Sequence, residues 1–404
     1  MDELFTIHNR LLTSVNLDFQ RSLLTDIDWN LPLLEIRGSR GVGKTTIMLQ
    51  QAKLLQQQGV NVLYTSLDTP YFFTTSLVEL ADQFTKFGGT HLFLDEVHRY
   101  PAKFKDSDWS LELKNLVDAY PNLKIVYSGS SILHLYKGKG DLSRRKASYL
   151  LNGLSFREYL QLNGIKSIER YGLSDLLSNH QEIAAGLIGD FKPLLHFRDY
   201  LNVGYYPFYT GNEGVYFKQL QDVINLTIDT DLPYLTPVSQ GAREQLKRLL
   251  GAISTTVPYV PNMSRLAEML GITDHRTLMK YIQLLDEAQI LNVVRSHAKG
   301  NKVLQKPEKI LIENTNLMRA LGMSMADVGT IRETFFFSQL AFKHTVSYSG
   351  KADFLVDNTY LFEIGGTAKK KKQLENETNA FVVKDGIEIG FGNVIPLWMM
   401  GLLY

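Results

Sequence analysis

A run of residues near the N-terminus has the types and spacing of a phosphate-binding loop. It matches the pattern G-x-x-x-x-G-K-T, follows an apolar run and opens a helix-forming one. Glycines let backbone N–H groups turn toward phosphate oxygens at a helix N-terminus, where the helix dipole also favours an anion. The residues expected to bind the nucleotide are Gly38, Ser39, Arg40, Gly41, Val42, Gly43, Lys44, Thr45 and Thr46.

Within this loop, two side chains have distinct expected roles. The ammonium group of Lys44 should bind the β- and γ-phosphates, and the hydroxyl of Thr45 should hold Mg²⁺. A glycine-rich turn that merely caps a helix is the alternative, but the preceding strand and following helix favour the loop. The motif therefore predicts binding of ATP together with Mg²⁺.

A second motif is the acidic pair Asp95 and Glu96, which follows the apolar run His91-Leu92-Phe93-Leu94. At a strand end, such a pair can place one carboxylate on the metal and the next beside the attacking water. Adjacent acids are common by chance, but the upstream phosphate-binding motif favours catalysis. We assign Asp95 to Mg²⁺ and Glu96 to the water.

Two serines lie at the end of a further apolar run, LKIVYSG. Ser128 or Ser130 could present its hydroxyl to the γ-phosphate as a sensor. A serine that simply caps the strand fits this position equally well.

These motifs depend on elements that alternate along the first third of the chain. The apolar runs Leu33–Ile36, Val62–Tyr64, Leu92–Leu94 and Ile125–Tyr127 are too short for helices, and helical patterns separate them. Because they lack polar alternation, they suit strands that are covered on both faces. We therefore predict an α/β fold with a parallel sheet, and a P-loop ATPase core over residues 1–160.

The remaining chain suggests three further parts. Helical periodicity predicts a helical lid or connector over residues 161–235, in which the aromatic segment 204–209 has no assigned role. Three helical patterns and two strands around a Gly-Asn turn predict a winged helix over residues 236–310. A helix followed by short strands predicts a small α/β domain over residues 311–404.

Composition narrows the class of protein. The absence of cysteine excludes disulfides, thiolate metal sites and a cysteine nucleophile, and it suits a reducing interior. No stretch approaches the ~20 apolar residues of a membrane helix, and no signal peptide is recognisable, so we expect a cytoplasmic protein without membrane contact. The net charge of +1 means that nucleic-acid binding would need a local basic patch.

Together, these segments resemble the AAA-like ATP-binding proteins of bacteria and archaea, which join a P-loop ATPase, a winged helix and a restriction-nuclease-like C-terminal domain. The resemblance covers nearly the whole chain. GSRGVGKT and HLFLDEVH are shared by many ATPases, whereas the more specific segments are SGSS, LNGLSFREYL, ENTNLMRAL, ADFLVD, LFEIGG and IPLWMMGLLY.

The resemblance also implies a second candidate site near the C-terminus. Glu333, Asp353 and Glu363 stand where nucleases of this superfamily hold a divalent ion, but Gly365 occupies the usual lysine position. Lysines 369–372 could substitute, although such a run is more often a solvated face or a phosphate-contacting patch. We expect an inactive, retained fold.

Basic residues gather in the predicted winged helix, where they suit phosphate contacts along double-stranded DNA. Use of this part for protein contact, or as a lid, is the alternative. His275 and His297 are expected on the surface and not as metal ligands. The basic residues are Arg276, Lys280, Arg295, Lys299, Lys302 and Lys306.

Arg144 and Arg145 follow the SGSS segment. The resemblance implies that an arginine in this region reaches the γ-phosphate bound by a neighbouring subunit, which would require a homo-oligomer. A solvated surface pair is the alternative.

These observations predict an ATP-hydrolysing switch or remodeller that engages DNA. An ATP-controlled platform for protein partners, without nucleic-acid binding, is a second hypothesis. An ATP-gated nuclease is a third, and Gly365 counts against it.

Overall fold

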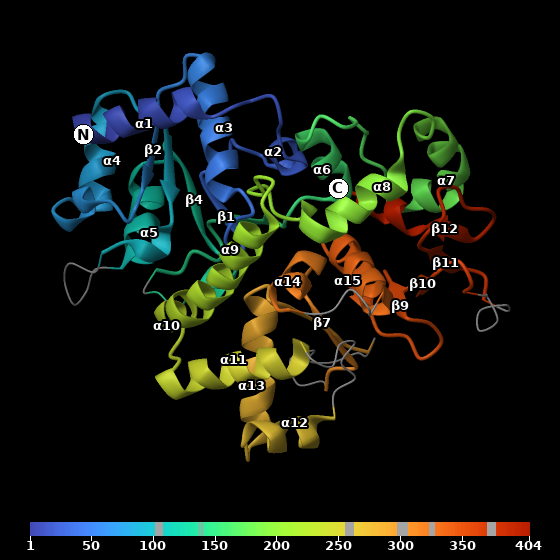
Figure 1. The fold of residues 1–404 in the computed structure, drawn as a ribbon. Coiled ribbons are helices and arrows are strands. Elements are labelled where there is room, and N and C mark those ends of the chain that lie inside the picture. Colours follow the sequence, from blue (N-terminus) through green and yellow to red (C-terminus); the bar gives the residue numbers. More distant parts are fainter. Residues whose placement is uncertain are drawn as a thin grey trace. The chain divides into compact units, whose positions relative to one another are not determined.

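The computed structural model describes residues 1–101, 108–136, 138, 140–254, 262–296, 306–322, 328–369 and 377–404. The chain forms two compact units, and Figure 1 labels many of their elements. The first contains Met1–Asn152 and Asp229–Val238, and the second contains Gly153–Ile228 and Ser239–Tyr404. The finer boundaries expected from the sequence, 1–160, 161–235, 236–310 and 311–404, stay predictions.

A five-stranded parallel sheet lies at the centre of the first unit. In space its strands follow the order β2-β3-β4-β1-β5, and the apolar side chains of β1 to β4 are buried. This confirms the predicted α/β fold with a parallel sheet. The strands are β1 (Leu33–Gly38), β2 (Val62–Ser66), β3 (His91–Asp95), β4 (Lys124–Ser130) and β5 (Ala147–Leu150).

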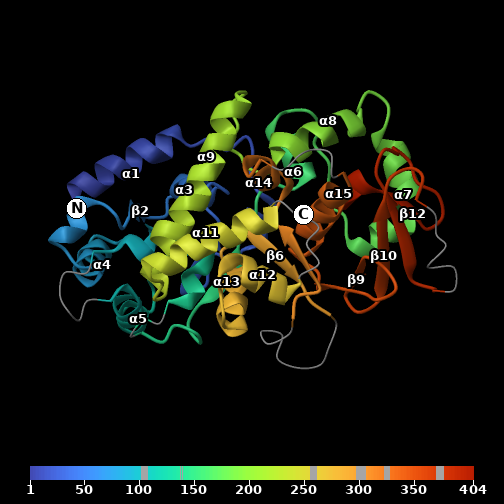
Figure 2. The same cartoon turned by 60° about the horizontal axis from the view of Figure 1, so that its bottom comes forward.

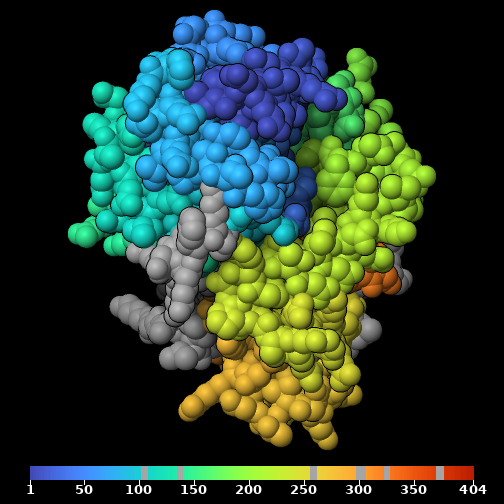
Figure 3. Space-filling view, turned by 90° about the vertical axis from the view of Figure 1, so that its left-hand side faces the viewer, coloured from blue at the N-terminus to red at the C-terminus, as the bar shows by residue number. Residues whose placement is uncertain are grey.

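Helices cover this sheet. The side chain of His8 on α1 is buried against edge strand β2, where its Nδ1 accepts the backbone N–H of Tyr64 at 3.0 Å. Phe5 of α1 contacts Phe84 of α4, and Figure 3 shows the two helices side by side in dark and lighter blue. The helices of this unit are α1 (Asp2–Ser14), α2 (Ser22–Asp26), α3 (Lys44–Gln57), α4 (Leu77–Lys86), α5 (Trp109–Ala119) and α10 (Leu232–Leu235).

The second unit begins with helices. They are α6 (Phe156–Leu162), α7 (Leu173–Leu187), α8 (Pro193–Asp199) and α9 (Glu213–Leu226). Next come α11 (Gln240–Ser254), α12 (Met263–Leu270), α13 (His275–Glu287) and the antiparallel strands β6 (Leu291–Val294) and β7 (Lys309–Ile312). Figure 2 shows α11, α12, α13 and β6 grouped together, and the assignment of a winged helix to this part stays a prediction. The predicted Gly-Asn turn lies outside the described residues.

A second five-stranded sheet follows helices α14 (Thr315–Ala320) and α15 (Val328–Leu340). It has the order β12-β11-β10-β9-β8 and mixes parallel with antiparallel pairs. Phe336 of α15 packs on it, with its ring centroid 5.4 Å from that of Phe354 and 5.1 Å from that of Phe362. The strands are β8 (Val346–Ser347), β9 (Phe354–Val356), β10 (Tyr360–Gly365), β11 (Ala380–Lys384) and β12 (Val394–Pro396).

The aromatic segment 204–209 joins a buried polar network in this unit. The hydroxyl of Tyr205 donates to Glu313 Oε1 at 2.5 Å, and its backbone N–H donates to Asn316 Oδ1 at 2.9 Å. The hydroxyl of Tyr216 donates to the same Asn316 oxygen at 2.7 Å. Burial raises the pKa of Glu313 to about 7. The network therefore ties the segment after α8 to the start of α14.

Within the described ranges, no helix has both the length and the apolar character needed to cross a bilayer.

Candidate functional site

The predicted phosphate-binding loop connects β1 to α3. Gly41 and Gly43 take left-handed φ values of 83° and 101°, which residues with a Cβ rarely adopt. Val42 is fully buried and anchors the loop. Its carbonyl oxygen accepts a hydrogen bond from Nη1 of the buried Arg21 at 2.9 Å. The loop is therefore fixed in the core while its end opens helix α3, the position at which a helix N-terminus favours anions.

Lys44 is the first residue of α3, and it is buried. Its Nζ donates to the carbonyls of Gly38 at 2.9 Å and of Ser39 at 3.0 Å. Burial lowers the pKa of this ammonium group, and the negative charges of Glu96 and Asp95 oppose that effect. A phosphate in the loop would supply a stronger counter-charge for it.

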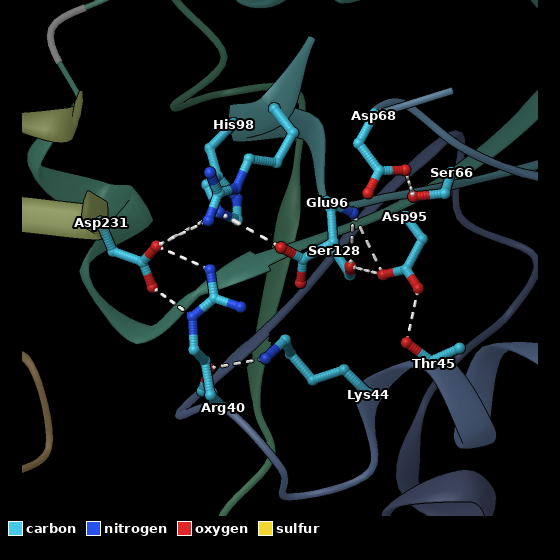
Figure 4. Close-up of polar contacts among 12 residues, drawn as sticks. Arg40, Lys44, Thr45, Ser66, Asp68, Asp95, Glu96, His98, Ser128 and Asp231 are labelled. Carbon is cyan, nitrogen blue, oxygen red and sulfur yellow. Dashed lines mark hydrogen bonds and ion pairs between the residues drawn. The ribbon is translucent and has the colours of Figure 1, made fainter. Parts of the chain in front are cut away.

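Asp95 ends β3 and is held by hydroxyl groups from three elements. Thr45 Oγ1 donates to its Oδ2 at 2.6 Å, the hydroxyl of Tyr64 on β2 donates to the same atom at 2.7 Å, and Ser128 Oγ on β4 donates to Oδ1. Figure 4 shows the contacts of Asp95 with Thr45 and with Ser128.

The oxygens of Thr45 and Asp95 fit Mg²⁺. They are hard donors, and Mg²⁺ commonly keeps water and substrate phosphate oxygens beside one or two protein ligands. Across the described residues, no group of three or more His, Cys, Asp or Glu side chains is arranged to hold a metal ion. A Mg²⁺ ion held by the oxygens of Thr45 and Asp95 would take its other ligands from nucleotide and water.

Glu96 follows Asp95 with a left-handed φ of 55°, a strained value for a residue with a side chain. Its N–H donates to Asp95 Oδ1 and to Ser128 Oγ, each at 3.1 Å. Figure 4 shows its carboxylate on the side of Arg40 and Lys44, whereas Asp95 faces Thr45. Burial raises the pKa of Glu96, and the nearby Lys44 charge opposes this.

The serine and arginine candidates lie in different surroundings. Ser128 is fully buried and joins the two acids, and Ser130 is also buried. Arg144 is exposed, and Arg145 donates from Nε and Nη2 to Asp118 at 2.9 and 3.1 Å. The sensor role of Ser128 and the intersubunit role of the arginines stay predictions.

Sequence reasoning missed several residues that surround the site, among them Asp231 and His98. Asp231 forms two hydrogen bonds with Arg40 of the loop, although the two lie far apart in the sequence. The buried His98 places its Nε2 3.2 Å from Glu96 Oε2, and burial lowers its pKa to about 4, so it is neutral near pH 7. No motif marks Asp231. The nearness of His98 to the acidic pair was the one available signal.

The C-terminal acids Glu333, Asp353 and Glu363 lie close to lysine side chains. Lys309 Nζ lies 2.5 Å from Glu333 Oε2 and 3.9 Å from Asp353 Oδ1, and Lys369 Nζ lies 2.6 Å from Glu363 Oε1. A Cβ at position 365 would stand 2.6 Å from the Cβ of Lys369, so glycine makes room for that side chain. Lys369 thus approaches from downstream, and lysines 370–372 lie outside the described residues.

The basic residues of the predicted winged helix are only partly available. Arg276 and Lys280 are exposed on α13, and Lys306 and His275 are exposed. Arg295 Nη1 instead donates to Asp286 at 3.3 Å. His297, Lys299 and Lys302 lie outside the described residues.

Two family models match this chain. Residues 30–160 match an AAA domain, and residues 194–327 match a domain of unknown function (DUF8612). The parallel sheet, the loop and the acidic pair lie within the segment that matches the AAA domain. No curated protein matches the sequence.

Several solved structures are similar at low identity. The Walker-type ATPase PABY2304 of Pyrococcus abyssi is 14% identical with a TM-score of 0.44, and the match covers 75% of this chain and 96% of that one. AMPPCP-bound DnaA from Aquifex aeolicus is 16% identical with a TM-score of 0.27, and the match covers 70% of this chain and 87% of that one. The Aeropyrum pernix ORC1 protein in complex with DNA is 13% identical with a TM-score of 0.31, and the match covers 78% of this chain and 91% of that one.

Proposed function

We propose that this protein is a molecular switch that binds ATP with Mg²⁺, hydrolyses it and engages double-stranded DNA. The observation that carries the ATPase assignment is the convergence of Lys44, Thr45, Asp95 and Glu96 at the carboxyl edge of one parallel sheet. Ligands of α/β proteins bind at this edge.

Each of these side chains has a separate task. Lys44 moves from the loop carbonyls to the phosphates, and the backbone N–H groups at the start of α3 bind phosphate oxygens. Glu96 orients the attacking water and accepts its proton, and Ser128 holds both acids in place. When bound, Mg²⁺ supplies positive charge to the phosphate oxygens.

The test separates binding from turnover. Lys44→Ala should abolish ATP binding measured by calorimetry, because it removes the ammonium group that pairs with phosphate. Glu96→Gln should retain binding and lose turnover by about 100-fold or more, because the amide cannot accept a proton. Equal loss of binding in both variants would contradict these assignments. Lys218→Gln, at an exposed position on α9 of the second unit, is the control and should behave as wild type.

The second part of the proposal is that the protein binds double-stranded DNA. The exposed Arg276 and Lys280 on α13 support it, because the second helix of a helix-turn-helix enters the major groove. We expect duplex binding by the full chain to weaken linearly in log salt, with a slope reduced by about one unit for each phosphate contact removed. Arg276→Gln combined with Lys280→Gln should reduce the slope, whereas Lys86→Gln combined with Lys218→Gln should not. Salt-independent association would favour the protein-platform hypothesis.

A further inference from the structure

Arg40, the third residue of the phosphate-binding loop, is bound by a buried carboxylate from a distant segment. Its Nε donates to Asp231 Oδ2 at 2.8 Å, and its Nη2 donates to Asp231 Oδ1 at 2.7 Å. The side chain of Asp231 is 1% exposed, and that of Arg40 is 23% exposed. This bidentate geometry fixes the plane of the guanidinium group as well as its position.

Asp231 has two further neighbours besides Arg40, namely Arg99 and His98. Arg99 Nη2 lies 3.5 Å from Asp231 Oδ1, so two arginines share one carboxylate. His98 Nε2 lies 3.9 Å from the same oxygen, but this imidazole is neutral near pH 7. Asp231 alone thus faces two guanidinium groups, and one of them, Arg40, belongs to the phosphate-binding loop.

The geometry directs the remaining nitrogen of Arg40 into the site. Asp231 engages Nε and Nη2, and Figure 4 shows the third nitrogen, Nη1, on the side of Lys44 and Glu96. Lys44 is expected at the β- and γ-phosphates and Glu96 beside the attacking water. A donor on this side therefore faces the region that a γ-phosphate would occupy and that ADP would leave empty.

Asp231 also has a particular place in the chain. It ends the π-helical turn Thr227–Asp231, within which the chain passes from the second compact unit into the first. Such turns are rare and occur often at functional sites. The first-unit segment that carries Asp231, residues 229–238, also includes α10. A change at Arg40 would thus act directly on this connecting segment.

We propose that Arg40 senses the γ-phosphate, that Asp231 is the residue that positions it, and that residues 229–238 thereby respond to whether ATP or ADP is bound. The inference rests on the proposed binding of ATP. Asp231 holds one edge of the Arg40 guanidinium group, so the other edge can bind a phosphate oxygen. Because the group is already ordered, this binding does not carry the entropy cost of immobilising the side chain.

The first experiment measures the ratio of ATP to ADP affinity in the full chain carrying Glu96→Gln, which prevents turnover. This background protein should prefer ATP. Arg40→Gln should reduce the preference about 10-fold, in line with the loss of a charge-assisted hydrogen bond. Asp231→Asn should reduce it less, because the amide keeps one acceptor oxygen for Arg40. A general loss of stability would weaken ATP and ADP binding together and leave the ratio unchanged.

Arg99→Gln is the matched control, since it removes a second positive charge next to Asp231 from outside the loop. It should reduce the affinity ratio less than Arg40→Gln does, because Arg99 contacts Asp231 from outside the loop. If it reduces the ratio as much as Arg40→Gln does, the effect is general electrostatics and the inference fails. If Asp231→Asn does not fold, Arg40→Lys serves in its place, because lysine keeps the charge but cannot bridge Asp231 and phosphate.

The second experiment follows hydrogen exchange of residues 227–238 in the Glu96→Gln protein. Exchange should be slower with ATP than with ADP, and Arg40→Gln should remove this difference. An unchanged affinity ratio in Arg40→Gln, or equal exchange with both nucleotides, would overturn the inference while the proposed ATP binding stands. A failure of the background protein to bind either nucleotide would instead remove both.

Discussion

Asp95 and Glu96 are neighbours in the chain, but their carboxylates meet different surroundings. Asp95 accepts hydrogen bonds from the hydroxyl groups of Thr45, Tyr64 and Ser128. Glu96 is turned away by its left-handed backbone, and burial raises its pKa. The ring of hydroxyl groups around Asp95 suits a metal ligand, and the buried surroundings of Glu96 suit a group that takes up a proton.

This difference predicts how hydrolysis depends on pH. Glu96 must be deprotonated to accept a proton, and its pKa is raised, so turnover should fall as pH decreases and should do so above the pH at which an ordinary glutamate titrates. His98, with a pKa of about 4, stays neutral over this range and should not contribute. The measurement is kcat at saturating Mg-ATP from pH 5 to 8.

ATP affinity of Glu96→Gln over the same pH range is the control, because it separates titration of the nucleotide from titration of Glu96. A kcat that stays constant down to pH 5 would contradict the assigned role.

At the residue scale, sequence could predict what a contiguous motif contains. The loop and the acidic pair were recognisable because their spacing is local, and the structure brings Thr45 and Asp95 within 2.6 Å. Their catalytic roles stay predictions. Tyr64, Arg21 and Asp231 were not recognisable, since each reaches the site only through the folded sheet or a distant segment.

At the scale of elements, strands β1 to β4 were predicted because each contains a short apolar run that is buried on both faces. Strand β5 was missed, since its residues are half-buried or exposed and lack such a run. The aromatic segment 204–209 was left without a role because its partners, Glu313 and Asn316, lie about a hundred residues downstream. Such long-range polar contacts leave no periodicity in the sequence.

The C-terminal sheet gives the prediction at this scale. Lys309 and Lys369 already pair with Glu333 and Glu363, so a divalent ion would have to displace two ammonium groups. With Mg²⁺ or Mn²⁺, the purified protein should therefore not cut duplex DNA. Asp353→Ala should leave that result unchanged in a plasmid-nicking assay. Lys351→Ala, which removes an exposed lysine on the same domain, is the matched control.

Metal-dependent nicking that disappears in Asp353→Ala or Glu363→Ala would contradict this prediction. It would also identify Lys369 as the lysine that replaces the missing one beside Gly365, because no other described position brings an ammonium group so close to Glu363.

At the scale of the whole molecule, the assignment of residues to units could not be predicted. Residues 229–238 belong with the first unit, although they lie far along the chain from residues 1–152, which make up the rest of it. The ion pair between Arg40 and Asp231 accounts for part of this placement, because a buried bidentate contact ties the segment to the loop. A link of this kind between distant residues is invisible to composition and periodicity.

Assembly is the remaining property at this scale, and it gives the last prediction. Arg145 is engaged by Asp118, whereas Arg144 is exposed, so Arg144 is the better placed of the two to reach a neighbouring subunit. An arginine that contacts the γ-phosphate from a second chain contributes about 10³-fold or more to turnover. Hydrolysis per chain should therefore rise with protein concentration, and Arg144→Ala should lose turnover while keeping ATP affinity. Arg145→Ala should lose less of the turnover.

Mixing Arg144→Ala with Lys44→Ala should restore part of the activity, because one chain supplies an intact nucleotide site and the other supplies the arginine. A rate per chain that is independent of concentration, together with full activity of Arg144→Ala, would show that each chain hydrolyses ATP alone.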